Sequence, residues 1–125
     1  VSVPRWRASD TGPDALFPGH REPIRRWGEI VGGLPVRYKI AQVYLARTEA
    51  IRKVRWDPAI RMVDHRDFFS RAAGEIVVVL DQSIRAYHAQ TPFDTEYARY
   101  RLDIADDLAY LNGVWRERAA GNGPT

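Results

Sequence analysis

Hydrophobic side chains recur at helical spacing through the middle of the chain, between residues 67 and 88. They stand three or four positions apart, at Phe69, Ala73, Ile76, Leu80, Ile84 and Tyr87. Such spacing places them on one face of an α-helix. Residues 76–80 are apolar on every side, which is typical of an element surrounded by partners. The pattern therefore predicts a long central helix over residues 67–88.

The run at residues 76–80 also fits a buried strand. It contains one Ile and three Val, and β-branched side chains lose rotamer freedom in a helix and suit strands. Gly74, just before the run, stands where a strand could open. The periodic pattern continues from Phe69 to Tyr87, beyond the length of a usual strand. We therefore predict the helix and keep a buried strand over 76–80 as its alternative.

Proline and capping signals predict three further helices. They follow Pro23, Pro35 and Pro92 and cover residues 24–30, 36–55 and 93–118. Proline suits the first turn of a helix, and Gly32 with Gly33 would end the first of them. Thr91 and Asp94 stand where a capping box has its hydroxyl and its acid. Together these segments predict an all-α fold, an antiparallel bundle of three long helices plus one short N-terminal helix.

The two ends of the chain differ from its middle. Residues 1–22 are rich in Pro and Gly and show no period, which predicts an extended arm. Trp6, Leu16 and Phe17 give this arm apolar anchors that pack either on the body of the chain or on a neighbouring copy. The predicted organisation is an extended arm over 1–22, a single helical domain over 23–119 and a flexible tail over 120–125.

The composition excludes several kinds of site. The chain has 125 residues, 45% of them hydrophobic, which suits one domain with a substantial core. The absence of cysteine excludes disulfides, thiolate metal sites and cysteine nucleophiles. No apolar run reaches the length of a membrane span, and the first residues show no apolar signal region. We expect a soluble protein that is located in the cytoplasm.

Basic side chains gather in the first half of the chain. Residues 1–66 hold 13 basic and 7 acidic side chains, a net charge of +6, whereas residues 67–125 hold 6 and 9, a net charge of −3. The candidate binding residues are Arg25, Arg26, Arg37, Lys39, Arg52, Lys53, Arg55 and Trp56. Cations on one helix face beside an aromatic ring suit phosphates and stacked bases. The favoured alternative is a solvated face, or ion pairs with Asp94, Asp103, Asp106 and Asp107 in the acidic half.

Sequence signatures of catalysis are absent. The chain has no glycine-rich phosphate loop, no GxSxG, no HExxH and no EF-hand pattern. His20, His65 and His88 have no second His or Cys at metal-ligand spacing. Asp103 and Asp107 stand four apart and could act as an acid–base pair, but structural ion pairs are the favoured role. We expect no catalytic residue, no metal and no cofactor, and we favour a protein that is not an enzyme.

The favoured function is an interaction or assembly subunit. We expect a protein partner or a homo-oligomer, in which Trp6, Leu16 and Phe17 of the arm grip a neighbouring copy. The alternative is a nucleic-acid-binding protein that uses a basic helix from Arg37 to Arg55. The sequence leaves open whether the core of the bundle binds a small molecule.

Overall fold

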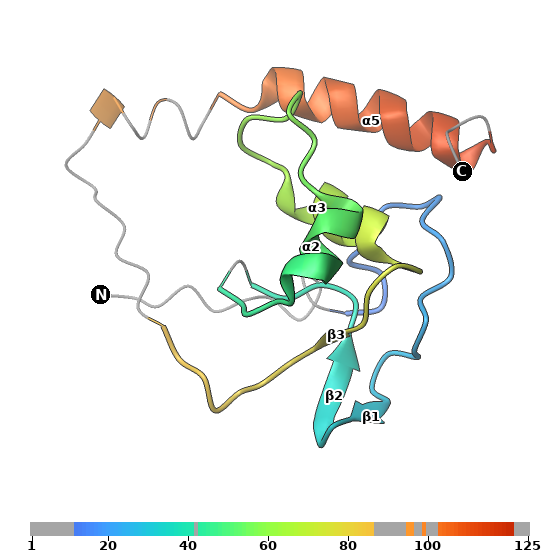
Figure 1. Cartoon of the computed structure of the whole chain (residues 1–125). Coiled ribbons are helices and arrows are strands. Elements are labelled where there is room, and N and C mark those ends of the chain that lie inside the picture. The colour runs from blue at the N-terminus through green and yellow to red at the C-terminus, as the bar shows by residue number, and fades with distance from the viewer. Residues whose placement is uncertain (1–11, 42, 87–94, 97–98, 100–102, 122–125) are drawn as a thin grey trace.

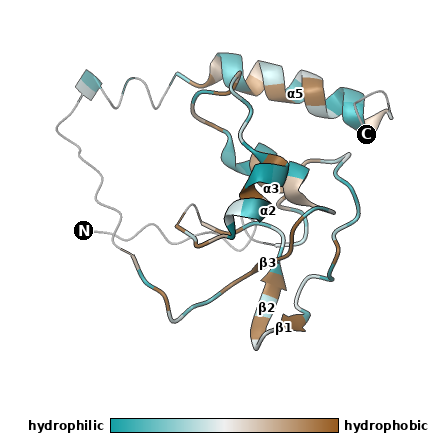
Figure 2. Cartoon of the chain, in the orientation of Figure 1, coloured by the Kyte–Doolittle hydropathy of each residue, from teal (hydrophilic) through white to brown (hydrophobic). Residues whose placement is uncertain are grey.

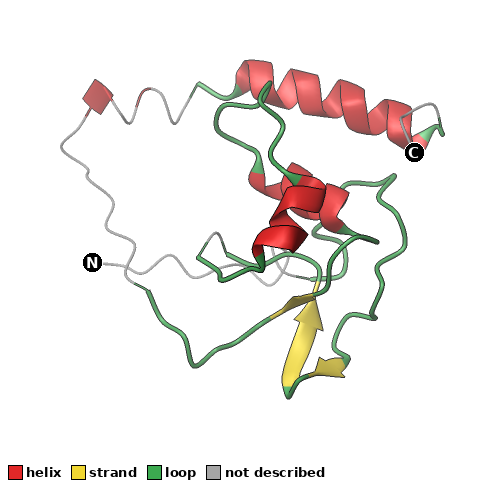
Figure 3. Cartoon of the chain, viewed as in Figure 1, coloured by secondary structure: helices red, strands yellow, loops and turns green. Residues whose placement is uncertain are grey.

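The computed structural model of the chain describes residues 12–41, 43–86, 95, 96, 99 and 103–121. Its elements are β1 (Ile30–Val31), β2 (Leu34–Arg37), α2 (Thr48–Val54), α3 (His65–Ala72), β3 (Val78–Val79) and α5 (Ala105–Ala119). They form three tiers, with α5 above, α2 and α3 in the middle and the small sheet below (Figure 1). Loops connect these elements over much of the chain (Figure 3).

The predicted all-α bundle of three long helices is wrong. α2 has 7 residues and α3 has 8, and three short strands pair into an antiparallel sheet of order β1-β2-β3. Among the elements of the described residues, α5 with its 15 residues comes nearest to a predicted length. The periodic stretches are cut by glycines in left-handed conformations, which the spacing of apolar side chains does not reveal.

Gly32 and Gly33 form the turn of a β-hairpin rather than the end of a helix. Their φ angles are 58° and 81°, and a two-residue type I′ turn requires positive φ at both positions. β1 and β2 pair across this turn, with Val31 opposite Leu34. Residues 24–30, predicted as a short helix, instead form turns that lead into β1.

The long helix predicted over residues 36–55 is wrong over its first half. Val36 belongs to β2, and the described residues between β2 and α2 are neither helix nor strand. Val36 is buried, and Ile40 and Tyr44 pack against the core. These three positions are four apart, a spacing that fits both one face of a helix and the alternation of an extended chain. The spacing alone therefore could not distinguish the two.

The central stretch is a short helix followed by a strand. Gly74 comes after α3 with a φ of 84°, and a Cβ at this position would lie 3.2 Å from the carbonyl oxygen of Glu22. Both the conformation and the close approach require glycine. β3 then pairs with β2, with Val79 opposite Val36. The helix predicted through residues 76–80 is therefore wrong. The alternative of a buried strand over this run is correct only for Val78 and Val79, which are half-buried.

Two clusters of buried side chains form the core. The first contains Leu16, Phe68, Phe69 and Ala73, and the second contains Ile60, Leu111 and Trp115. Ile104, Leu108, Leu111 and Trp115 have the spacing of one helix face along the last helix. Of these, Leu111 and Trp115 are buried, at 2% and 4% exposed, whereas Leu108 is 43% exposed. Gly121 follows the C-cap of α5 with a φ of 78°. The predicted capping box at Thr91 and Asp94 lies outside the described residues.

Truncation at the centre of either cluster should destabilise the whole fold. We expect Phe68→Ala to lower the free energy of unfolding by about 3–5 kcal/mol and Leu111→Ala by about 2–5 kcal/mol, because each leaves a cavity. Urea unfolding measures both. Leu45→Ala is the control, since Leu45 is 92% exposed and its loss should cost almost nothing. Equal effects at all three positions would contradict the two-cluster core.

Candidate binding surface

The predicted basic residues do not share one helix. They fall into two groups, one around the sheet and one around α2. The sheet group is Arg25, Arg26, Arg37 and Lys39, and the α2 group is Arg52, Lys53, Arg55 and Trp56. The basic helix expected from Arg37 to Arg55 is therefore wrong, because β2 and an extended segment occupy its first half.

The α2 group is exposed at the C-terminal end of its helix. Arg52 and Lys53 stand in the last turn of α2, and Arg55 is its C-cap. None of the three forms an ion pair with an acid in the described part of the chain. Trp56 stacks on Phe68 with 4.8 Å between ring centroids, and 44% of Trp56 stays exposed.

The acids near the end of the chain have other partners. Asp106 lies 3.8 Å from the guanidinium of Arg61, and Asp103 is exposed. The ion pairs expected between these acids and the basic residues are therefore wrong among the described residues, and Asp94 lies outside them. The two halves of the chain still attract each other through Arg61 and Asp106, and through Arg21 and Glu75.

Asp107 is a structural carboxylate rather than half of an acid–base pair. It is 4% exposed and accepts backbone N–H groups from the loop that precedes α3. The donors are Met62 at 2.7 Å, Arg61 at 3.1 Å and Val63 at 3.3 Å. These hydrogen bonds, that of Met62 above all, hold the pKa of Asp107 below its usual range. The carboxylate thereby ties α5 to the loop.

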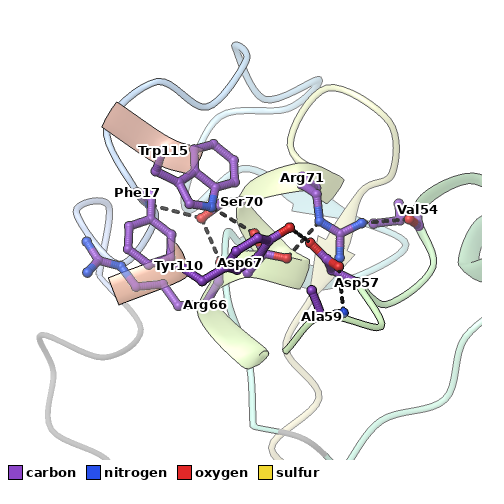
Figure 4. Close-up of polar contacts among 10 residues, drawn as sticks. All are labelled: Phe17, Val54, Asp57, Ala59, Arg66, Asp67, Ser70, Arg71, Tyr110 and Trp115. Carbon is purple, nitrogen blue, oxygen red and sulfur yellow. Dashed lines mark hydrogen bonds and ion pairs between the residues drawn. The ribbon is translucent and has the colours of Figure 1, made fainter. Parts of the chain in front are cut away.

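A buried carboxylate on α3 forms an ion pair within its own helix and a hydrogen bond to α5 (Figure 4). Asp67 on α3 is 2% exposed, and its carboxylate accepts the indole N–H of Trp115 at 2.7 Å and Nε of Arg71 at 2.8 Å. Arg71 also donates from Nη1 to the carbonyl of Val54 at 2.7 Å. Both oxygens of Asp67 and two nitrogens of Arg71 have protein partners, whereas Nη2 of Arg71 is buried without one among the described residues. Because these partners link α3 to α5 and to the end of α2, we assign the network to the fold.

A second polar contact holds α5 to the loop after α2. The hydroxyl of Tyr110 donates to Asp57 at 2.6 Å, and the same carboxylate accepts the N–H of Ala59 at 2.9 Å. The hydrogen bond from Tyr110 is the main cause of a lowered pKa at Asp57, and it raises the pKa of Tyr110. The contact again has a structural role.

Two of the three predicted self-association residues pack within their own chain. Leu16 is buried in the first cluster. Phe17 stacks on Trp115 with 5.4 Å between ring centroids, and its N–H donates to the hydroxyl of Ser70 at 2.9 Å. Trp6 lies outside the described residues. Self-association through the arm therefore stays a prediction that depends on Trp6.

Two cations of the sheet group border a shallow hollow. The guanidinium carbon of Arg37 lies 4.2 Å from the centre of the Trp27 ring, and Nη1 donates to the carbonyl of Val36 at 3.0 Å. Arg25 places Nη1 3.2 Å from the carboxylate of Glu29. The Trp27 ring and the Val36 carbonyl thus orient the side chain of Arg37. The ion pair of Arg25 with Glu29 is exposed and contributes little to stability.

The hollow lies between β2, β3, α3 and the segment that precedes β1. It measures about 290 Å³ with its open mouth included. Its lining is mostly apolar, and its charged members are Arg25 and Arg37, with no carboxylate. Phe69 of the first core cluster contributes to the lining, so the hollow opens directly onto the core.

Large apolar side chains stay exposed around this hollow. Ile24 and Val77 line it and are 53% and 39% exposed, and Trp27 is 38% exposed. On β1, Ile30 is 63% exposed, and the strands stand out as hydrophobic in Figure 2. Contiguous exposed apolar patches mark interaction sites in soluble proteins. We call Ile24, Arg25, Trp27, Arg37 and Val77 the sheet surface.

Sequence reasoning found only the charged part of the sheet surface. It named Arg25 and Arg37 but missed Ile24, Trp27 and Val77. An apolar residue at helical or strand spacing is assigned to the core by default, and nothing in the sequence marks one that stays exposed. A hairpin turn at the two adjacent glycines was the signal that could have brought these segments together.

His65 is held inside the fold. Its Nε2 forms a hydrogen bond with the carbonyl of Ile40, and its ring meets Phe69 edge to face at 5.1 Å. Burial is the main cause of a lowered pKa for this imidazole. In the part of the chain that the structure describes, no group of three or more His, Asp or Glu side chains could hold a metal ion.

Comparison with known proteins gives no relative. No protein-family model, no curated protein and no solved structure matches this chain. Within the described residues, no helix has the length and apolar character that crossing a membrane requires.

The carboxylate of Asp107 should make the stability of the fold depend on pH. The pKa of Asp107 in the fold is below the ordinary 3.8. Its contribution to the free energy of unfolding is therefore complete above pH 3.8 and is lost as the pH falls through the folded pKa. Asp107→Asn should therefore lower the Tm at neutral pH. The difference from the unmodified chain should shrink in acid, as measured by thermal unfolding between neutral pH and about pH 2.5.

Asp106→Asn is the matched control on the same helix. The Asp106 side chain is 90% exposed and makes only a 3.8 Å ion pair. Exposed pairs of this kind contribute about 0–1 kcal/mol, so this variant should melt close to the unmodified chain at every pH. A Tm difference for Asp107→Asn that stays constant with pH would contradict the assigned role.

Proposed function

We propose that this chain is a non-enzymatic binding protein that recognises a partner protein through the sheet surface. The observation that carries this proposal is the apolar hollow with Ile24, Trp27 and Val77 exposed around it and two guanidinium groups at its border. Aromatic residues and arginine are the side chains most enriched at the centres of protein interfaces.

The size and chemistry of the hollow support a protein partner over a substrate. Pockets for small molecules measure about 300–1,000 Å³ and bury most of the ligand. The free volume of this hollow, without its open mouth, is about 20 Å³, which is far smaller. Its lining contains no carboxylate, histidine or serine that could act as an acid, a base or a nucleophile.

The core of the chain supports the same proposal. The described residues bury few large side chains, and eleven large apolar side chains stay substantially exposed. Exposed apolar surface of this extent costs free energy in water unless a partner covers it, since each buried Å² contributes about 25 cal/mol. A partner on the sheet surface would bury three of these side chains, Ile24, Trp27 and Val77.

Selection from a random peptide library displayed on phage, with the intact chain as bait, tests the proposal. We expect enriched peptides whose capture falls about tenfold or more on Ile24→Asp, because a central interface side chain contributes about 2 kcal/mol or more. Leu45→Asp, another exposed apolar position, should leave the capture unchanged. No enrichment, or equal loss in both variants, would contradict the proposal.

Nucleic acid is a second candidate ligand, and the α2 group favours it. Arg52, Lys53 and Arg55 are exposed and form no ion pair within the described residues, and Trp56 beside them offers an exposed ring for stacking. Arg47, immediately before α2, is exposed as well. The α2 group supports this candidate independently of the sheet surface.

Salt dependence distinguishes real phosphate contacts from weak general attraction. Four contacts on duplex DNA should give a slope of about −3.6 for log K against log salt, and Arg52→Ala should reduce its size by about one unit. Arg116→Ala, at an exposed position of α5, should leave the slope unchanged. A binding titration by fluorescence anisotropy that detects no complex at low salt would exclude this candidate.

A further inference from the structure

We infer that the sheet surface takes an extended, acidic peptide segment of a partner protein. The segment adds to β3 as a further strand and packs one apolar side chain against the mouth of the hollow. This inference rests on the proposed function and names the chemistry of its partner.

The open edge of β3 carries the backbone part of the inference. β3 stands at the end of the strand order, and Leu80 donates its N–H to the carbonyl of Pro35 at 3.0 Å on the β2 side. Backbone groups of a strand alternate in direction, so Val77 and Val79 direct theirs to the other side. No described residue forms a ladder with that side. An edge of this kind accepts an added strand.

The sequence of this edge contains few features that prevent strand addition. Residues 76–80 are all apolar and include neither proline nor lysine. The flanking acids are Glu75, which pairs with Arg21, and Asp81, which accepts the N–H of Ser83 at 3.0 Å. A hydrophobic edge with so little protection is suited to a specific strand from a partner.

The charges at the hollow select an acidic segment. Arg25 and Arg37 line it and no carboxylate does. Arg37 lines the hollow from β2, opposite Val78, with its guanidinium over Trp27. A long acidic side chain that extends from the added strand across the mouth of the hollow would reach it. Asp81 at the far end of the run repels acids there. The acidic residues of the segment therefore belong at the end nearest Val77.

A second copy of this chain fits the edge poorly. Each copy carries a formal net charge of +3, and pairing two β3 edges would bring two sets of Arg25 and Arg37 together. Like charges that meet at an interface oppose association, whereas an acidic segment is attracted. The free space inside the hollow is only about 20 Å³, so an apolar side chain of the segment packs against the exposed Ile24 and Val77 at its mouth.

The test uses the intact chain and fluorescein-labelled peptides that alternate polar residues with leucine and carry glutamate at the polar positions of one end. We expect the glutamate peptide to bind, its glutamine analogue to bind about tenfold more weakly, and its lysine analogue not to bind. Arg37→Gln should raise the Kd of the glutamate peptide about tenfold, because the variant loses a charge-assisted contact. Arg116→Gln, on exposed α5, should leave the Kd unchanged.

Strand addition has its own readout. Hydrogen exchange followed by NMR should show the amides of Val77 and Val79 protected on binding, with little change at Leu80, which is already bonded to Pro35. Val77→Pro removes an outward N–H without removing a bond to β2, and edge strands tolerate proline at such a position. This variant should no longer bind the glutamate peptide, while its melting temperature should stay within a few degrees of that of the unmodified chain.

The outcomes separate this inference from the proposed function. The selected peptides could require Ile24, carry no acids and bind Arg37→Gln as tightly as the unmodified chain. In that case the inference that the segment is acidic is wrong, and the proposed binding surface is retained. If Val77 and Val79 exchange equally fast in the free and bound chain, strand addition is wrong. If no peptide binds in an Ile24-dependent manner, both proposals fall.

Discussion

The rest of the structure depends on the contacts of one buried group, the carboxylate of Asp67. It accepts the indole N–H of Trp115 from the second cluster, while its neighbour Phe68 belongs to the first. Arg71 neutralises the charge of Asp67 and donates a hydrogen bond to the carbonyl of Val54 at the end of α2. Leaving one partner of a buried ion pair alone costs about 3–5 kcal/mol. Two clusters too small to form separate domains are thereby held as one body.

This arrangement leaves the sheet free for another task. The tie at Asp67 and the contacts at Asp57 and Asp107 all hold α5 or the loops beside α3, and none involves the strands. The sheet is attached through Val78, which packs against the first cluster, and Val36 of β2 is buried. Exposed apolar side chains around the hollow are therefore not needed to close the core, which is why we assign them to a partner.

The sequence predicted those features that depend on one element at a time. The stripe at Leu111 and Trp115 identified the buried face of α5, and the β-branched run at 76–80 gave the strand as an alternative. The prediction from the sequence failed where residues with positive φ turn the chain, at the Gly32–Gly33 hairpin and at Gly74. The hollow could not be predicted, because it arises where four segments distant in sequence meet.

Hydrogen exchange of the free chain, measured residue by residue by NMR, tests the central claim most directly. A locked body with an open sheet edge predicts slow exchange at the Trp115 indole and the Leu80 amide, whose hydrogen bonds break only when the structure opens. The same claim predicts fast exchange at the amides of Val77 and Val79. Protection at Val77 and Val79 equal to that at Leu80, or a Trp115 indole that exchanges as fast as the exposed Trp56, would contradict it.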